Sequence, residues 1–178
     1  MTSTRGDDRV LGTVRRLQDG KGAVRLEVLY DTDIEDLWSA LTEPHRLARW
    51  IAEVEGDLRP GGQIHARFTS AWEGPGRIDT CQAPHRLAVT LAPDTDDQTV
   101  IEATLAAEDD GTRTRTRLVI EERGLPIDAL AYHGAGWQDH VEDLSAHLHG
   151  EPSGGWHPRW TALTPVYEEL RRGLGPAT

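Results

Sequence analysis

Apolar and polar residues alternate along most of the chain, which predicts a series of β-strands. The pattern is clear at 23–30, where Val24, Leu26 and Val28 mark one face. It is clearest at 112–121, where threonine and aliphatic residues occupy one face and arginines the other. Such alternation indicates an antiparallel sheet with one covered face and one wet face. Further strands are expected at 64–68, 77–82, 86–92 and 99–107, with a weaker one at 10–17.

Two short helices are expected directly after the strand at 23–30. A capping segment at 31–33 precedes apolar residues spaced three and four apart from Ile34 to Leu41. Pro44 then stands at the first turn of a second short helix. Farther along, the sequence EGPG at 73–76 predicts a turn.

Helical periodicity returns in the last third of the chain. A long amphipathic helix is expected from near Ile127, stopped by Gly150 and Pro152. A last amphipathic segment covers 156–172, but Pro165 lacks a backbone donor and disfavours helix ahead of it.

This order of elements predicts an α+β fold, in which a curved antiparallel sheet is wrapped around a long C-terminal helix. The two short helices would close one end, and the space between helix and sheet can be hollow. A length of 178 residues favours one domain. We expect a frayed or disordered stretch at 1–9, the domain at 10–150, and a helical extension at 151–178. The extension should pack on the domain because its tryptophans would otherwise lie in water.

The charge balance narrows the classes of partner. A net charge of -11 disfavours nucleic acid and anionic membranes as partners. The chain has no apolar run of the ~20 residues that span a bilayer, and its first ten residues are polar, unlike a signal peptide. We therefore expect a cytoplasmic protein without membrane insertion. The single cysteine, Cys81, excludes an internal disulfide.

A series of short sequence motifs, in their order along the chain, resembles the START/Bet v 1-like (helix-grip) superfamily. Within it, they resemble bacterial proteins similar to the C-terminal domain of the Hsp90 ATPase activator. The resemblance covers roughly 23–149 and implies an internal hydrophobic cavity. Members bind hydrophobic small molecules, act on polyketides, confer antibiotic self-resistance or assist a chaperone. The motifs that carry the resemblance are DLWSALTEP at 36–44 with Leu47 and Trp50, RPGG at 59–62, GRI at 76–78, PHRL at 84–87, GTRT at 111–114, GLP at 124–126 and GW at 136–137.

The resemblance places helix ends, the inner sheet face and the long helix around one cavity. Aromatic side chains there would stack on flat ligands, although they could equally fill a solid core. A histidine on the long helix could donate to a ligand carbonyl or act as acid or base. The expected ligand-binding residues are Trp50, Phe68, Trp72, His133, Trp137, His140 and Val141.

The sequence offers little for metal or covalent chemistry. His133, His140 and His147 recur at heptad spacing, so neighbours lie about 10 Å apart along a helix, too far to share one metal ion. Cys81 is expected on the same strand face as Asp79, where the carboxylate would disfavour the thiolate. We find no nucleophile elbow or phosphate-binding glycine loop in the sequence. The expectation is therefore no metal, no cofactor and no strong catalytic site.

The leading hypothesis is a protein that binds a hydrophobic, aromatic or polyketide-like small molecule without strong catalysis. One alternative is a polyketide cyclase or aromatase, in which His133 assists proton transfer, or a polyketide-antibiotic self-resistance protein. Another is a chaperone-interacting module, similar to the Hsp90 ATPase activator. The expected oligomeric state is a monomer or weak homodimer.

Overall fold

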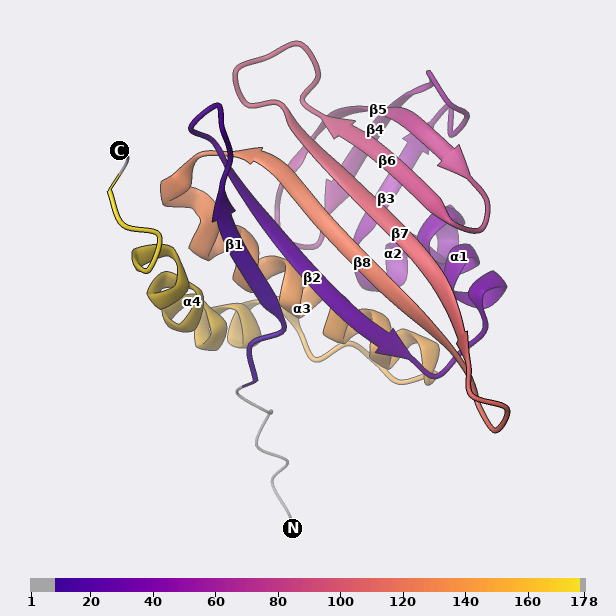
Figure 1. The fold of residues 1–178 in the computed structure, drawn as a ribbon. Helices are drawn as coiled ribbons and strands as arrows, with labels where there is room; N and C mark the ends of the chain where they lie inside the picture. Colours follow the sequence, from indigo (N-terminus) through magenta and orange to yellow (C-terminus); the bar gives the residue numbers. More distant parts are fainter. Residues whose placement is uncertain (1–8, 177–178) are drawn as a thin grey trace.

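The computed structural model describes residues 9–176 and shows a curved antiparallel sheet wrapped around one long helix (Figure 1). Eight strands form it in the order β1-β2-β8-β7-β6-β5-β4-β3. The frayed stretch expected at 1–9 lies, except for Arg9, outside the described residues. The strands are β1 (Gly12–Arg16), β2 (Gly22–Tyr30), β3 (Ala52–Gly56), β4 (Gln63–Phe68), β5 (Glu73–Gln82), β6 (Arg86–Leu91), β7 (Thr99–Asp109) and β8 (Thr114–Leu125).

Helices cover the concave side of this sheet. In Figure 1, α3 runs behind the long strands, α1 and α2 lie together at one end, and α4 lies beside α3 near β1. This arrangement confirms the predicted helix-grip architecture. Among the described residues, no helix is long and apolar enough to cross a membrane. The helices are α1 (Ile34–Thr42), α2 (Pro44–Trp50), α3 (Leu130–Leu148), preceded by a 3-10 turn (Ile127–Ala129), and α4 (Trp156–Arg172).

The hydrophobic core lies between α3 and the inner face of the sheet. Leu26 on β2 stands opposite Ile120 on β8, and both are almost fully buried. Tyr30 at the end of β2 donates its hydroxyl to the carbonyl of Val141 on α3 at 2.8 Å. This buried bond fixes the position of the helix over the sheet, because an unpaired hydroxyl there would be costly.

Local capping explains the two short helices as the sequence predicts. The Asp33 side chain accepts from the backbone N–H of Asp36 at 2.8 Å and starts α1, while Pro44 occupies the first turn of α2. At the end of α2, the buried Trp50 donates its Nε1–H to the Ala40 carbonyl at 2.9 Å. The two helices are thereby tied into one unit.

The predicted turn at 73–76 is wrong, because β5 already begins at Glu73. The chain turns earlier, at 69–72, where Ala71 adopts a left-handed backbone with φ 71°. Gly76 serves close packing instead, since a Cβ there would lie 3.1 Å from both Ile64 and the Thr90 carbonyl. The strand β3 was not expected from the sequence, because its five residues include only two apolar positions that alternate, Ala52 and Val54.

Cys81 does not share a face with Asp79, contrary to the sequence-based expectation. A bulge shifts the register of β5 and β6 between Ile78 and Thr80. One extra residue reverses the faces beyond it, so Cys81 turns towards the apolar interior while Asp79 pairs with Arg77 outside.

The last helix, α4, continues through Pro165 without interruption, so the expected break ahead of the proline is absent. Pro165 lies on the exposed face, where water can satisfy the carbonyl that loses its partner. On the opposite face, Tyr167 is fully buried and its hydroxyl bonds the Gly12 backbone N–H at 3.0 Å and the Gln138 side chain at 2.8 Å. A Cβ at Gly134 would lie 2.2 Å from the Tyr167 ring, so glycine allows this close approach.

Candidate functional site

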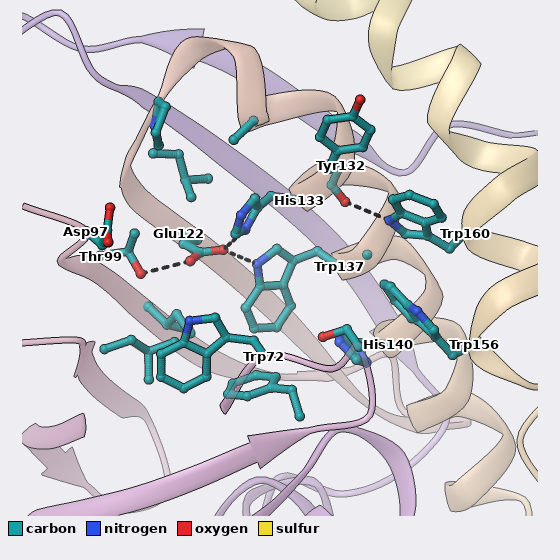
Figure 2. A pocket seen from close by; sticks show the side chains of 18 of the residues that line it. Trp72, Asp97, Thr99, Glu122, Tyr132, His133, Trp137, His140, Trp156 and Trp160 are labelled. Atoms are coloured by element: carbon teal, nitrogen blue, oxygen red, sulfur yellow. Dashed lines mark hydrogen bonds and ion pairs between the residues drawn. The ribbon is translucent and has the colours of Figure 1, made fainter. Parts of the chain in front are cut away.

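A cavity of about 510 Å³ lies where α3, the start of α4 and the inner face of the sheet meet (Figure 2). The strands contribute the ends of β4, β6 and β8 and the start of β7, and the turn at 69–72 contributes Ser70 and Trp72. The helices contribute the first half of α3 and the first turns of α4. The volume falls within the ~300–1,000 Å³ typical of small-molecule sites.

Aromatic rings form a large part of the cavity wall. Phe68 and Trp72 meet edge to face, with ring centroids 5.6 Å apart. On the other side, Trp156 stacks on His140 at 5.3 Å and contacts Trp160 at 5.9 Å. These rings present flat apolar surface to the space between them, which suits a planar guest.

Glu122, near the end of β8, places a buried carboxylate among these aromatic side chains. It is 4% exposed and accepts three hydrogen bonds: from Thr99 Oγ1 at 2.9 Å, from Trp137 Nε1 at 2.7 Å and from His133 Nδ1 at 3.0 Å. Figure 2 shows the three donors converging on it from β7 and α3. Three donors satisfy most of what an ionised carboxylate requires in a buried position.

Glu122 and His133 form an ion pair in which the carboxylate is buried and the imidazole is partly exposed. Burial alone would raise the pKa of Glu122, but the hydrogen bond and charge of His133, with Trp137 and Thr99, hold it below its usual value. Burial likewise opposes charge on His133, and Glu122 outweighs it and raises the His133 pKa. Because Nδ1 is engaged by the carboxylate, Nε2 is the ring nitrogen left for a ligand.

His140 differs from His133 although both line the cavity. Burial lowers the pKa of His140 to about 4, against the opposing effects of the Trp50 backbone and the Glu122 charge. Its Nδ1 has no hydrogen-bond partner among the described residues. At neutral pH, His140 is therefore an uncharged ring held between Trp156 and Trp137, and its role in the wall is that of an aromatic residue.

One family model matches most of the chain, residues 31–149, and its description is Activator of Hsp90 ATPase homolog 1-like protein. The chain belongs to this family. The matched region begins after β2 and ends just beyond α3, so this family member carries β1, β2 and α4 outside it. A comparison with curated proteins gives no match.

Solved structures share the fold of this Hsp90-activator-like chain. CalU16 from Micromonospora echinospora is 25% identical, with a TM-score of 0.73, over 90% of this chain and 95% of that one. DynU16, a putative protein in the dynemicin biosynthetic locus, is 24% identical with a TM-score of 0.64, over 74% of this chain and 49% of that one. An HSP90 activator from Plasmodium falciparum is 18% identical with a TM-score of 0.59, over 73% and 97%.

In this family member, five of the seven residues expected at the site line the cavity together: Phe68, Trp72, His133, Trp137 and His140. Val141 lines neither this cavity nor the smaller one, and is buried behind the wall with its carbonyl bonded to Tyr30. His147, the third histidine at heptad spacing, lies away from the cavity and accepts from Arg46 Nε at 3.1 Å.

Trp50 lines a second, smaller compartment of about 140 Å³. This second space, called the inner compartment below, adjoins the first cavity and lies among α1, α2, α3 and strands β3 to β8. The two spaces share the side chains of Phe68, Leu91, Ile101 and Trp137. Trp50 therefore belongs to a different part of the interior from Trp72 and His133.

Glu122 and the contributions of α4 to the cavity were not expected from the sequence. The strand was expected to end at 121, whereas β8 continues to Leu125. Thr116, Leu118 and Ile120 all face inward, and the same alternation places Glu122 inside. Trp156 and Trp160 were expected to pack on the domain, but nothing local in the sequence assigns them to the cavity wall.

Asp139 on α3 is expected to make stability depend on pH. It is 2% exposed, and its Oδ2 has no hydrogen-bond partner among the described residues. Burial, together with Asp143 and Glu142, raises its pKa from 3.8 to about 7. The folded state thus keeps a proton that the unfolded chain releases near pH 4, so stability is lost as pH rises from about 4 to about 7.

Replacing Asp139 with asparagine should remove this loss. We expect the melting temperature to rise by roughly 5 °C at pH 8 and by much less at pH 4. Circular dichroism melts across this range measure the effect, with the exposed Asp128→Asn as the matched control. An equal gain in melting temperature at every pH would show that deprotonation of Asp139 is not the cause of the loss.

Proposed function

We propose that this protein binds a hydrophobic, aromatic or polyketide-like small molecule in the cavity between α3, α4 and the sheet. The observation that carries the proposal is the wall: four of the chain's six tryptophans line one space of about 510 Å³. Aromatic walls with a few placed polar groups are characteristic of ligand sites. The structural likeness to DynU16, described as a putative protein of a biosynthetic locus, supports a natural-product ligand.

Titration with flat polyphenols, followed by tryptophan fluorescence, tests this function. We expect saturable quenching, because a planar ligand would lie against Trp72, Trp137, Trp156 or Trp160. The Trp72→Leu variant should bind at least tenfold more weakly, since it loses a stacking surface. Trp38→Leu is the matched control, because Trp38 on α1 lines neither compartment and should leave affinity unchanged. Absence of quenching by every such compound would favour a protein-interaction module.

A second candidate function is a proton-transfer enzyme of the cyclase or aromatase type. The ion pair of Glu122 and His133 favours it, because a carboxylate that fixes one imidazole nitrogen leaves the other available as acid or base. Glu122 raises the pKa of His133, which favours the protonated ring that a general acid requires. Sequestration of a polyketide antibiotic, as in self-resistance, is a case of the binding function proposed above.

The family description also supports a chaperone-interacting module, for which a stable chaperone partner in a pull-down would be the evidence. Such a module uses an exposed apolar patch. Within residues 9–176, the large hydrophobic side chains that are exposed are Tyr132 and Leu170. This sparse apolar surface favours small-molecule binding. The cytoplasmic location and the monomer or weak homodimer remain predictions.

A further inference from the structure

The inner compartment has a different chemistry from the outer cavity. Its lining consists of aliphatic and aromatic side chains with only Thr42 and Cys81 as exceptions, and it contains no charged group. The outer cavity holds Glu122, His133 and Asp97 among its rings. An apolar cavity of ~150 Å³ is large enough to hold benzene. At about 140 Å³, the inner compartment offers comparable room.

The side chains between the two spaces are unequal in how firmly they are held. Trp137 is 5% exposed and fixed by its hydrogen bond to Glu122 at 2.7 Å. Phe68 is only half-buried, has no polar atom to anchor it and stands at the end of β4, directly before the turn at 69–72. A rotation of the Phe68 side chain would therefore join the two spaces.

We infer that the ligand is bipartite: a planar, oxygen-bearing head fills the outer cavity, and a short aliphatic arm of about four to six carbons passes Phe68 into the inner compartment. The inference rests on the proposed function and adds the shape of the ligand to it. The head lies where Nε2 of His133 can donate to an oxygen acceptor. The arm lies in the inner compartment, where a polar group would find few hydrogen-bond partners.

A series of 2-naphthols with alkyl chains at position 6 tests the arm. With hydrogen, ethyl, butyl and hexyl substituents, we expect affinity to rise about threefold to fourfold for each methylene and to level off near the capacity of the compartment. Fluorescence titration measures each dissociation constant. A simple partitioning surface would give a gain that continues with chain length.

Two variants that fill the inner compartment test whether the rise in affinity with alkyl chain length arises there. Ala103 on β7 and Ala66 on β4 are almost fully buried and line the inner compartment alone. In Ala103→Leu, and in the milder Ala66→Val, the gain with chain length should disappear while the affinity for unsubstituted 2-naphthol stays within twofold. The second variant keeps the test intact if the first fails to fold. Ala106→Leu, at an exposed position on β7, is the matched control and should keep the wild-type series.

The outcomes separate the two proposals. If 2-naphthol binds but affinity is independent of chain length, or the gain persists in both filling variants, the bipartite ligand is overturned and the binding function stands. If no member of the series binds, the proposed function fails and the inference falls with it.

Discussion

Replacing Glu122 with leucine is expected to lower the free energy of unfolding by about 3 kcal/mol, because three donors would lose their shared acceptor. Thr99, His133 and Trp137 approach the carboxylate from β7 and from successive turns of α3. A buried donor left unpaired costs about 1–3 kcal/mol, and His133 can shed its proton and so lessen the total. Urea unfolding followed by circular dichroism measures the loss.

The neighbouring glutamate supplies the control for this prediction. Glu121 points to the other face of β8, where it pairs with Arg15 and Arg123 at the surface. Such pairs contribute up to about 1 kcal/mol, so Glu121→Leu should have a much smaller effect. Similar losses of unfolding free energy in the two variants would show that the hydrogen bonds around Glu122 stabilise the fold no more than a surface ion pair does.

The same ion pair should give stability a maximum in mildly acidic solution. The lowered pKa of Glu122 adds stability that is present above about pH 4.3 and is lost as pH falls through the folded-state value. The raised pKa of His133 adds stability that is present below about pH 6.5 and is lost as pH rises through its folded-state value. Both contributions are complete between about pH 4.3 and 6.5.

Glu122→Gln keeps the shape of the side chain and removes its charge. In this variant the pH maximum should flatten, and NMR titration should show a lower pKa for His133 than in the wild type. If the protein is an enzyme of the cyclase type, turnover should fall in the same variant. An unchanged His133 pKa would rule out the carboxylate as its cause.

Replacing Tyr167 with alanine is expected to destabilise the protein by about 3–5 kcal/mol and to loosen α4. The ring is fully buried against Gly134, and its hydroxyl joins α4 to β1 and α3 through Gly12 and Gln138. The variant loses both the packing and the two hydrogen bonds. Limited proteolysis should then cut within α4, while urea unfolding gives the change in stability.

Tyr132→Ala is the matched control, since Tyr132 is 55% exposed. Its loss should change stability by less than about 1 kcal/mol. A Tyr167→Ala protein as stable and protease-resistant as the wild type would mean that α4 does not depend on this anchor.

Most of the fold follows from local periodicity, because strands and helices bury one face with different repeats. The failures have local causes too. β3 has the sequence AEVEG, which gives too few apolar positions for a pattern, and the glycines at 74 and 76 indicate a turn when their role is close packing within β5. The bulge that turns Cys81 inward is set by pairing with β6, which single-strand patterns do not encode.

The site was less predictable than the fold. Phe68, Trp72, His133, Trp137 and His140 were expected at one cavity through the family resemblance, and the structure brings them together. Glu122 was missed because glutamate at an inward position contradicts the usual preference of buried strand faces. Its three partners come from two separate elements, so only the tertiary structure shows that its charge is satisfied.

Trp156 and Trp160 reach the cavity from α4, beyond the last residue of the family match. A relative that ended with α3 would keep the sheet, the ion pair and the inner compartment, but its pocket would be a trough open along one side. Redesigning the cavity-facing residues of this terminal helix, with the Tyr167 anchor kept, is therefore a way to alter which molecules the scaffold accommodates.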